Sequence, residues 1–130
     1  MIQFLKFWKS IITTIVICYL SFAQPDTFDK VPKLHIDNLD KLIHMIMYFA
    51  LTSILWYDYS KIVKHKTEKT LIIVGVVYPI LLGGFIEIAQ QKWFYPRTAE
   101  WIDWGADILG VLIGSILVFM VYKTKKKHER

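Results

Sequence analysis

The side chains best suited to chemistry form short polar rows within apolar stretches of the chain. Asp40, His44 and Tyr48 are spaced four residues apart, and so are Asp103 and Asp107. Residues at this spacing share one face of an α-helix. A carboxylate one turn from an imidazole can orient the ring as a general acid or base, and the same groups can bind a polar ligand. The pattern therefore predicts a polar site assembled from helix faces.

Other polar residues extend this predicted site. Glu87 and Gln90 are three residues apart near the end of the third apolar stretch, and Lys41 follows Asp40. Arg97 lies in the next connecting segment, and its planar guanidinium suits a phosphate or a carboxylate. An ion pair between Arg97 and a carboxylate of the site is an equally good interpretation. The predicted binding residues are Asp40, Lys41, His44, Tyr48, Glu87, Gln90, Arg97, Asp103 and Asp107.

The composition indicates which kind of protein carries these residues. Apolar residues make up 55% of the 130 residues and charged residues 21%, whereas soluble domains average about 45–50% and about 25%. The mean hydropathy is +0.38, and the apolar residues gather in four blocks. This composition excludes a disordered or collagen-like chain. The single cysteine, Cys18, excludes an intrachain disulfide framework.

Four apolar stretches are long enough to cross a membrane. A span needs about 20 mostly apolar residues, and a helix satisfies its backbone groups internally. Tryptophans and tyrosines, Trp104 among them, lie near the ends of these stretches, as in the aromatic belts of membrane proteins. We therefore expect an all-α fold, an integral membrane four-helix bundle that forms a single domain over 1–130. The predicted spans are 4–23, 39–59, 70–91 and 101–122.

The positive charges predict how the spans are oriented. Most of the 16 lysines and arginines fall in the N-terminal arm, the segment between the second and third spans, and the C-terminal tail. Segments rich in lysine and arginine stay on the cytoplasmic side, so both termini are expected there. The basic C-terminal tail would lie against the anionic inner leaflet. Nucleic-acid binding is not expected, because these lysines form no folded basic face. Most carboxylates instead fall at the outer ends of the spans.

The first apolar stretch has a second interpretation. Lys6 and Lys9 precede an apolar run that ends in Ser21-Phe22-Ala23. A basic start, an apolar middle and small residues at the end are also typical of a secretory signal peptide and its cleavage site. The pattern fits either a retained span or a signal that is removed.

His44, Glu87 and Asp107 fall at a similar depth in three different spans. With 1.5 Å of rise per residue, each lies roughly 6–9 Å inside the outer end of its helix. An ionisable group within a span costs roughly 2.5–3.5 kcal/mol unless it faces protein or water. We therefore expect these groups to face one another, or a pocket open to the outside. Alternatively, they serve only to fix the packing of the helices.

A metal site is a less favoured interpretation of the same residues. Zinc sites use several histidine and cysteine ligands, and His35 is the one other histidine on the outer side. A carboxylate-rich site for magnesium, calcium or manganese is an alternative. The expectation is that the chain uses no metal and no cofactor.

These motifs resemble the VanZ-like family of small bacterial integral membrane proteins. The matching motifs are Asp40-Lys41-xx-His44-xxx-Tyr48, Glu87-xx-Gln90, Pro96-Arg97 and Asp103-xxx-Asp107-xx-Gly110-xxx-Gly114. They cover residues 40 to 114, with one departure at Asp107, where the family often has asparagine. The resemblance implies a multi-pass protein of the bacterial cytoplasmic (inner) membrane that acts at the outer face of the cell envelope. It also implies a link to glycopeptide resistance of the teicoplanin type.

Two functions are compatible with these observations. The favoured one is a binding or accessory protein whose pocket recognises a membrane lipid headgroup or a lipid-linked envelope precursor. The alternative is a membrane enzyme in which His44, oriented by Asp40, acts as general acid or base. Glu87 would be its partner and Arg97 would hold a phosphate, although no nucleophile stands out. A transporter is less favoured, because four helices without an internal repeat would need a homo-oligomer to form a path.

Overall fold

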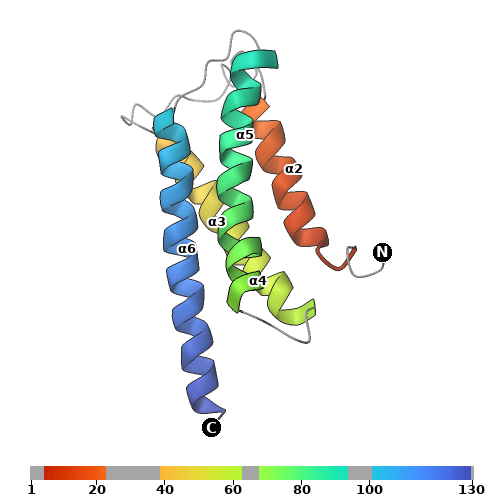
Figure 1. Ribbon diagram of the computed structural model, residues 1–130, viewed down its shortest axis with the longest axis vertical. Helices are drawn as coiled ribbons and strands as arrows, with labels where there is room; N and C mark the ends of the chain where they lie inside the picture. Colours follow the sequence, from red (N-terminus) through yellow and green to blue (C-terminus); the bar gives the residue numbers. More distant parts are fainter. Residues whose placement is uncertain (1–4, 23–38, 63–67, 94–100, 130) are drawn as a thin grey trace.

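The computed structural model describes residues 5–22, 39–62, 68–93 and 101–129. The regular elements in these ranges are all helical, and no strand occurs among them. Four helical segments lie side by side, each antiparallel to the one before it (Figure 1). The prediction of an all-α fold is therefore confirmed over the described residues.

The helices follow the predicted apolar stretches closely. They are α2 (Trp8–Phe22), α3 (Leu39–Ile62), α4 (Glu68–Ile72), the π-helix η2 (Ile73–Val77), α5 (Tyr78–Trp93) and α6 (Trp101–His128). The elements α4, η2 and α5 follow one another without a break and correspond to the third predicted span. Helix α6 continues beyond the predicted end at residue 122, because the lysines that follow are good helix formers.

Helix α6 packs more extensively on α3 than on any other described element. Gly110 of α6 lies against the backbone carbonyl group of Met45, so a side chain at this glycine would collide with α3. One turn further along, a Cβ atom at Gly114 would lie 3.2 Å from the carbonyl oxygen of Phe49. Small residues let two helix backbones approach. This pair of glycines therefore sets the short distance between α3 and α6.

A second pair of glycines makes room for an indole between α5 and α6. A Cβ atom at Gly83 would lie 3.1 Å from Cδ1 of Trp104, and one at Gly84 would lie 3.3 Å from Cε2 of the same ring. The Nε1 atom of Trp104 donates a hydrogen bond to the carbonyl oxygen of Ile80 at 2.9 Å. The sequence predicts that Trp104 belongs to an aromatic belt at the membrane surface. In the structure its ring packs between α5 and α6.

Pro79 accounts for the π-helix that precedes it. Proline has no backbone N–H, and its ring clashes with the carbonyl group four residues earlier in an α-helix. Here the chain widens over η2, and the N–H of Tyr78 donates to the carbonyl oxygen of Ile73, five residues back. Gly75 in this wider turn lies directly against the indole of Trp56 on α3. The π-helix therefore lets the third helical segment pass the proline while it stays packed on α3.

Polar contacts near both of its ends hold α2 against its neighbours. Near the start of α2, the Asp58 carboxylate of α3 accepts hydrogen bonds from the Ser10 backbone N–H at 3.2 Å and from the Ser10 hydroxyl at 2.7 Å. The first N–H groups of a helix lack partners within it, so Asp58 caps α2 from another helix. Near the end of α2, the side-chain amide of Gln90 donates to the Ser21 carbonyl oxygen at 2.6 Å. The stretch that also fits a signal peptide is thus packed as a helix at both of its ends.

The outward faces of the helices are largely apolar. Two stretches, Lys69–Trp93 and Trp101–Lys125, are long and apolar enough to cross a membrane. Only 28% and 22% of their most apolar windows are buried inside the protein, whereas the core helix of a soluble protein hides its apolar stripe against its neighbours. Large apolar side chains that remain exposed include Leu81, Phe85, Ile102 and Ile116.

Candidate functional site

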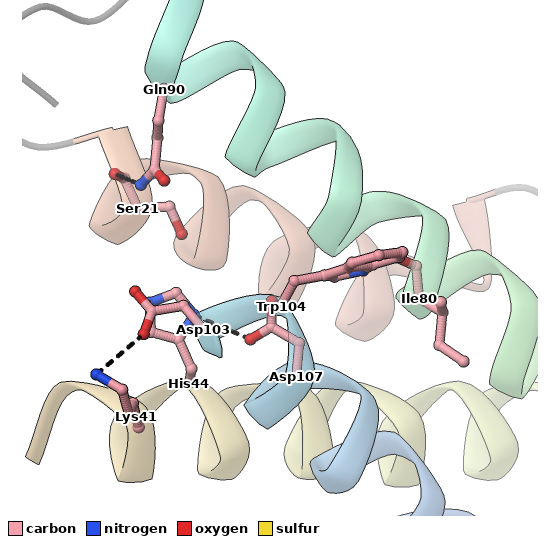
Figure 2. A network of polar contacts seen from close by, with 8 residues as sticks. All are labelled: Ser21, Lys41, His44, Ile80, Gln90, Asp103, Trp104 and Asp107. Atoms are coloured by element: carbon pink, nitrogen blue, oxygen red, sulfur yellow. Dashed lines mark hydrogen bonds and ion pairs between the residues drawn. The ribbon is translucent and has the colours of Figure 1, made fainter. Parts of the chain in front are cut away.

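Polar side chains from three helices meet near one end of the protein. We call Lys41, His44, Glu87, Asp103 and Asp107 the polar cluster. Helix α3 supplies Lys41 and His44, α5 supplies Glu87, and α6 supplies Asp103 and Asp107. The side chains from α3 and α6 point toward one another (Figure 2). The cluster lies at the end where α2 and α5 finish and where α3 and α6 begin (Figure 1).

The pair formed by His44 and Asp107 is the innermost contact between α3 and α6 in the cluster. Nδ1 of the imidazole and Oδ1 of the carboxylate lie 2.9 Å apart, within hydrogen-bond distance. The pair exists because Gly110, one turn from Asp107, brings α6 against Met45, the residue after His44. An ionised carboxylate can only accept a hydrogen bond. With Asp107 ionised, Nδ1 donates the hydrogen bond in this pair and Nε2 is left for a second partner.

A second set of contacts lies nearer the end of the helices. The Nζ atom of Lys41 is 3.7 Å from Oδ1 of Asp103, and Nε2 of His44 is 3.9 Å from Oδ2 of the same carboxylate. The Lys41 side chain is 27% exposed and that of Asp103 is 13% exposed, whereas that of Asp107 is 2% exposed. The cluster therefore runs from a partly exposed rim at Lys41 to a buried floor at Asp107.

Glu87 joins this buried floor from α5. One ligand atom from each of His44, Glu87 and Asp107 lies within 4.8 Å of the other two. Counted as whole residues, Glu87 and Asp107 are each 1% exposed. A Cβ atom at Gly83 would lie 2.8 Å from Oδ2 of Asp107, so the missing side chain there lets α5 approach the carboxylate. The structure thus brings together the three groups that the sequence predicts at one depth.

Two predicted binding residues lie beside the cluster and make other contacts. Gln90 uses its side-chain amide to hold the end of α2 through Ser21. Tyr48 is 1% exposed and belongs to the apolar core with Ile17 and Val111. These contacts give both residues a packing role, and their part in binding a ligand stays a prediction.

The remaining predicted positions lie outside the described residues. This is the case for Arg97 and for the side chain of Asp40, although residue 40 falls within α3. Sequence reasoning also missed Ser21, which the fold brings to this end of the protein beside Gln90 (Figure 2). A serine in an apolar stretch gives no signal of its own, because its neighbours come from other helices.

Comparison with known proteins gives one distant relationship. The chain is 25% identical over 120 residues to an uncharacterised protein of the fission yeast Schizosaccharomyces pombe. The match covers 92% of this chain and 66% of the yeast protein, just under two thirds of its length. No protein-family profile and no solved structure matches the chain.

Proposed function

We propose that this chain is an integral membrane protein with four spans and that its polar cluster faces the outside. The apolar outward faces and the two helices of sufficient length support a membrane location. The lysine-rich end of α6 lies at the opposite end from the polar cluster (Figure 1). With that tail in the cytoplasm, both termini are cytoplasmic and the tail lies against the anionic inner leaflet.

In this protein the polar cluster recognises the headgroup of a membrane lipid or of a lipid-linked envelope precursor, as expected for a VanZ-like protein. The observation that carries this proposal is the gradient from the partly exposed Lys41 to the buried Asp107. A headgroup phosphate would meet the Lys41 ammonium at the rim. Hydroxyl or amine groups of the headgroup would meet the imidazole and carboxylates below it.

The bacterial inner membrane and the link to teicoplanin rest on the resemblance to VanZ-like proteins alone, and the yeast relative is eukaryotic. Expression in a Gram-positive host tests this link. We expect the wild-type chain to raise the inhibitory concentration of teicoplanin, and Glu87→Ala to lose the effect at equal membrane abundance. If the wild-type chain gives no protection, the proposed link to glycopeptide resistance is rejected. The proposal of headgroup recognition is tested separately by lipid binding.

Lipid retention by the purified full-length chain tests headgroup recognition. Native mass spectrometry would compare phosphatidylglycerol bound to the wild type and to Lys41→Ala. We expect roughly tenfold weaker retention by the variant, since a hydrogen bond to a charged group contributes about 1.5 kcal/mol or more. Lys61→Ala is the matched control, because Lys61 lies at the other end of the same helix. An equal loss of bound lipid in both variants would mean that any lysine contributes through its charge alone, and would contradict the proposal.

The enzyme alternative is favoured by one specific observation. Asp107 lies within hydrogen-bond distance of His44 Nδ1, so a buried carboxylate orients the imidazole and turns Nε2 toward the rim of the cluster. An imidazole oriented in this way can act as a general acid or base. If the chain is an enzyme, incubation with a lipid-linked pyrophosphate yields a product detectable by mass spectrometry. His44→Ala would then abolish the product and leave lipid retention intact.

A further inference from the structure

The buried floor of the polar cluster has the donor set of a metal site. His44, Glu87 and Asp107 come from α3, α5 and α6, and each offers one ligand atom within 4.8 Å of the others. Donors on one tetrahedral zinc ion sit 2.0–2.2 Å from the metal, and therefore roughly 3.4 Å from each other. His44 Nδ1 and Asp107 Oδ1 lie 2.9 Å apart, at hydrogen-bond distance, so metal binding at these atoms would displace the proton that they share.

The charge of the cluster favours a cation over an anion at this point. Among the described residues, the cluster holds three carboxylates, one lysine and one histidine. Glu87 and Asp107 are almost fully buried, and carboxylates are common ligands of divalent cations in proteins. A bound divalent cation is often the largest local charge in a site of this kind.

A separate observation on α2 also points to a ligand. Ser21 is 4% exposed, and its hydroxyl oxygen has no hydrogen-bond partner among the described residues. Its backbone carbonyl is fixed by Gln90, and its hydroxyl points from α2 toward the side chains of His44 and Asp103 (Figure 2). Buried hydroxyls are normally hydrogen-bonded. A water molecule bound to a cation in the cluster would give this hydroxyl its partner.

We propose that His44, Glu87 and Asp107 bind one divalent first-row transition-metal ion, zinc or manganese. An imidazole with two carboxylates suits these ions better than calcium or magnesium, which prefer oxygen ligands alone. Three protein ligands leave coordination positions open for water, and the Ser21 hydroxyl accepts from or donates to that water. This proposal goes beyond headgroup recognition, because the ion binds whether or not a lipid is present.

The test uses the full-length chain in detergent micelles after treatment with a chelator. Isothermal titration with Zn²⁺, and separately with Mn²⁺, should show one equivalent bound by the wild type for at least one of the two ions. Glu87→Gln and Asp107→Asn keep the shape of each side chain and remove its charge. Ser21→Ala removes a group that contacts the ion only through water, and should weaken the affinity for the ion roughly tenfold. Glu87→Gln and Asp107→Asn each remove a direct ligand, and should weaken the affinity by more than that.

Asp58→Asn is the matched control, since Asp58 is a buried carboxylate that contacts α2 through Ser10. The asparagine oxygen can still accept from Ser10, and the affinity for the ion should not change. Circular dichroism and elution volume check that each variant is folded. If Glu87→Gln or Asp107→Asn does not fold, two other measurements test the proposal. Ser21→Ala should still bind the ion more weakly than the wild type does. Co²⁺ bound to the wild type should give an absorption band that disappears when Zn²⁺ displaces the Co²⁺.

Two results would overturn the proposal. One is the absence of stoichiometric Zn²⁺ or Mn²⁺ binding by the folded wild type. The other is an equal loss of affinity for the ion in Asp58→Asn and Asp107→Asn. That result would mean that the ion responds to the overall charge of the chain and not to the three proposed ligands. Headgroup recognition is scored separately by phosphatidylglycerol retention in metal-free protein, so that either proposal can fail without the other.

Discussion

At the scale of single residues, the partner of His44 matters most for the chemistry of the site. The sequence favours Asp40, because it lies one turn away on the same helix. The structure instead brings Asp107 to 2.9 Å from the imidazole, while the side chain of Asp40 lies outside the described residues. The contact between His44 and Asp107 joins residues 63 positions apart. Spacing within one helix could not reveal it.

Trp104 gives a prediction at the same scale. Its Nε1–H donates to the Ile80 carbonyl oxygen, so Trp104→Phe keeps an aromatic ring but loses this hydrogen bond and the five-membered ring packed against Gly83 and Gly84. The free energy of unfolding in detergent should fall by at least about 0.5–1.5 kcal/mol, the contribution of the hydrogen bond alone. Trp93→Phe serves as the control, since Trp93 is 67% exposed and its variant should unfold as the wild type does. An equal loss in both variants would contradict a specific role for the half-buried Trp104 indole.

At the scale of the helices, glycine decides which faces approach. The sequence indicates that Gly110 and Gly114 allow close packing of the fourth helix, and in the structure both lie against the backbone of α3. The role of Gly83 was harder to foresee, because it depends on Asp107 and Trp104 of a different helix. The cap that Asp58 gives to α2 could not be predicted either, since it joins residues 48 positions apart.

Two glycines of α6 provide a matched test of helix packing. A methyl group at Gly110 would collide with the Met45 carbonyl, whereas a Cβ atom at Gly105 would meet nothing within 4 Å. Gly110→Ala should therefore lower the free energy of unfolding by roughly 1–3 kcal/mol, as overpacking does. Gly105→Ala should raise it by roughly 0.5–1 kcal/mol, because alanine favours the helix. Denaturation of both variants in detergent measures the difference, and a stable Gly110→Ala would exclude the tight contact.

At the scale of the whole molecule, the two ends of the helices differ in chemistry. One end carries the polar cluster with its three carboxylates, and the other carries the lysines that follow Tyr122 on α6. Positively charged segments are retained on the cytoplasmic side of a membrane. In the topology that we propose, the lysine-rich end is therefore cytoplasmic and the polar cluster faces the opposite side.

Cysteine labelling in intact cells tests this orientation. In a Cys18→Ser background the chain has no cysteine, so a single new one can be placed at either end of α6. Trp101→Cys should react with a membrane-impermeant maleimide in intact cells, because Trp101 lies at the outer end and is exposed. Lys125→Cys should react only after the cells are permeabilised. Labelling of both positions, or of the reverse pair, in intact cells would reject the proposed topology.

The sequence by itself determined the helices and the depth of their polar groups. Helix formation depends on local apolar length and on local spacing, so the elements and the common level of His44, Glu87 and Asp107 follow from it. Only the tertiary structure decided which of these groups touch. Those contacts depend on how closely α6 approaches α3 and α5, and this distance is set by glycines and backbone groups far apart in the chain.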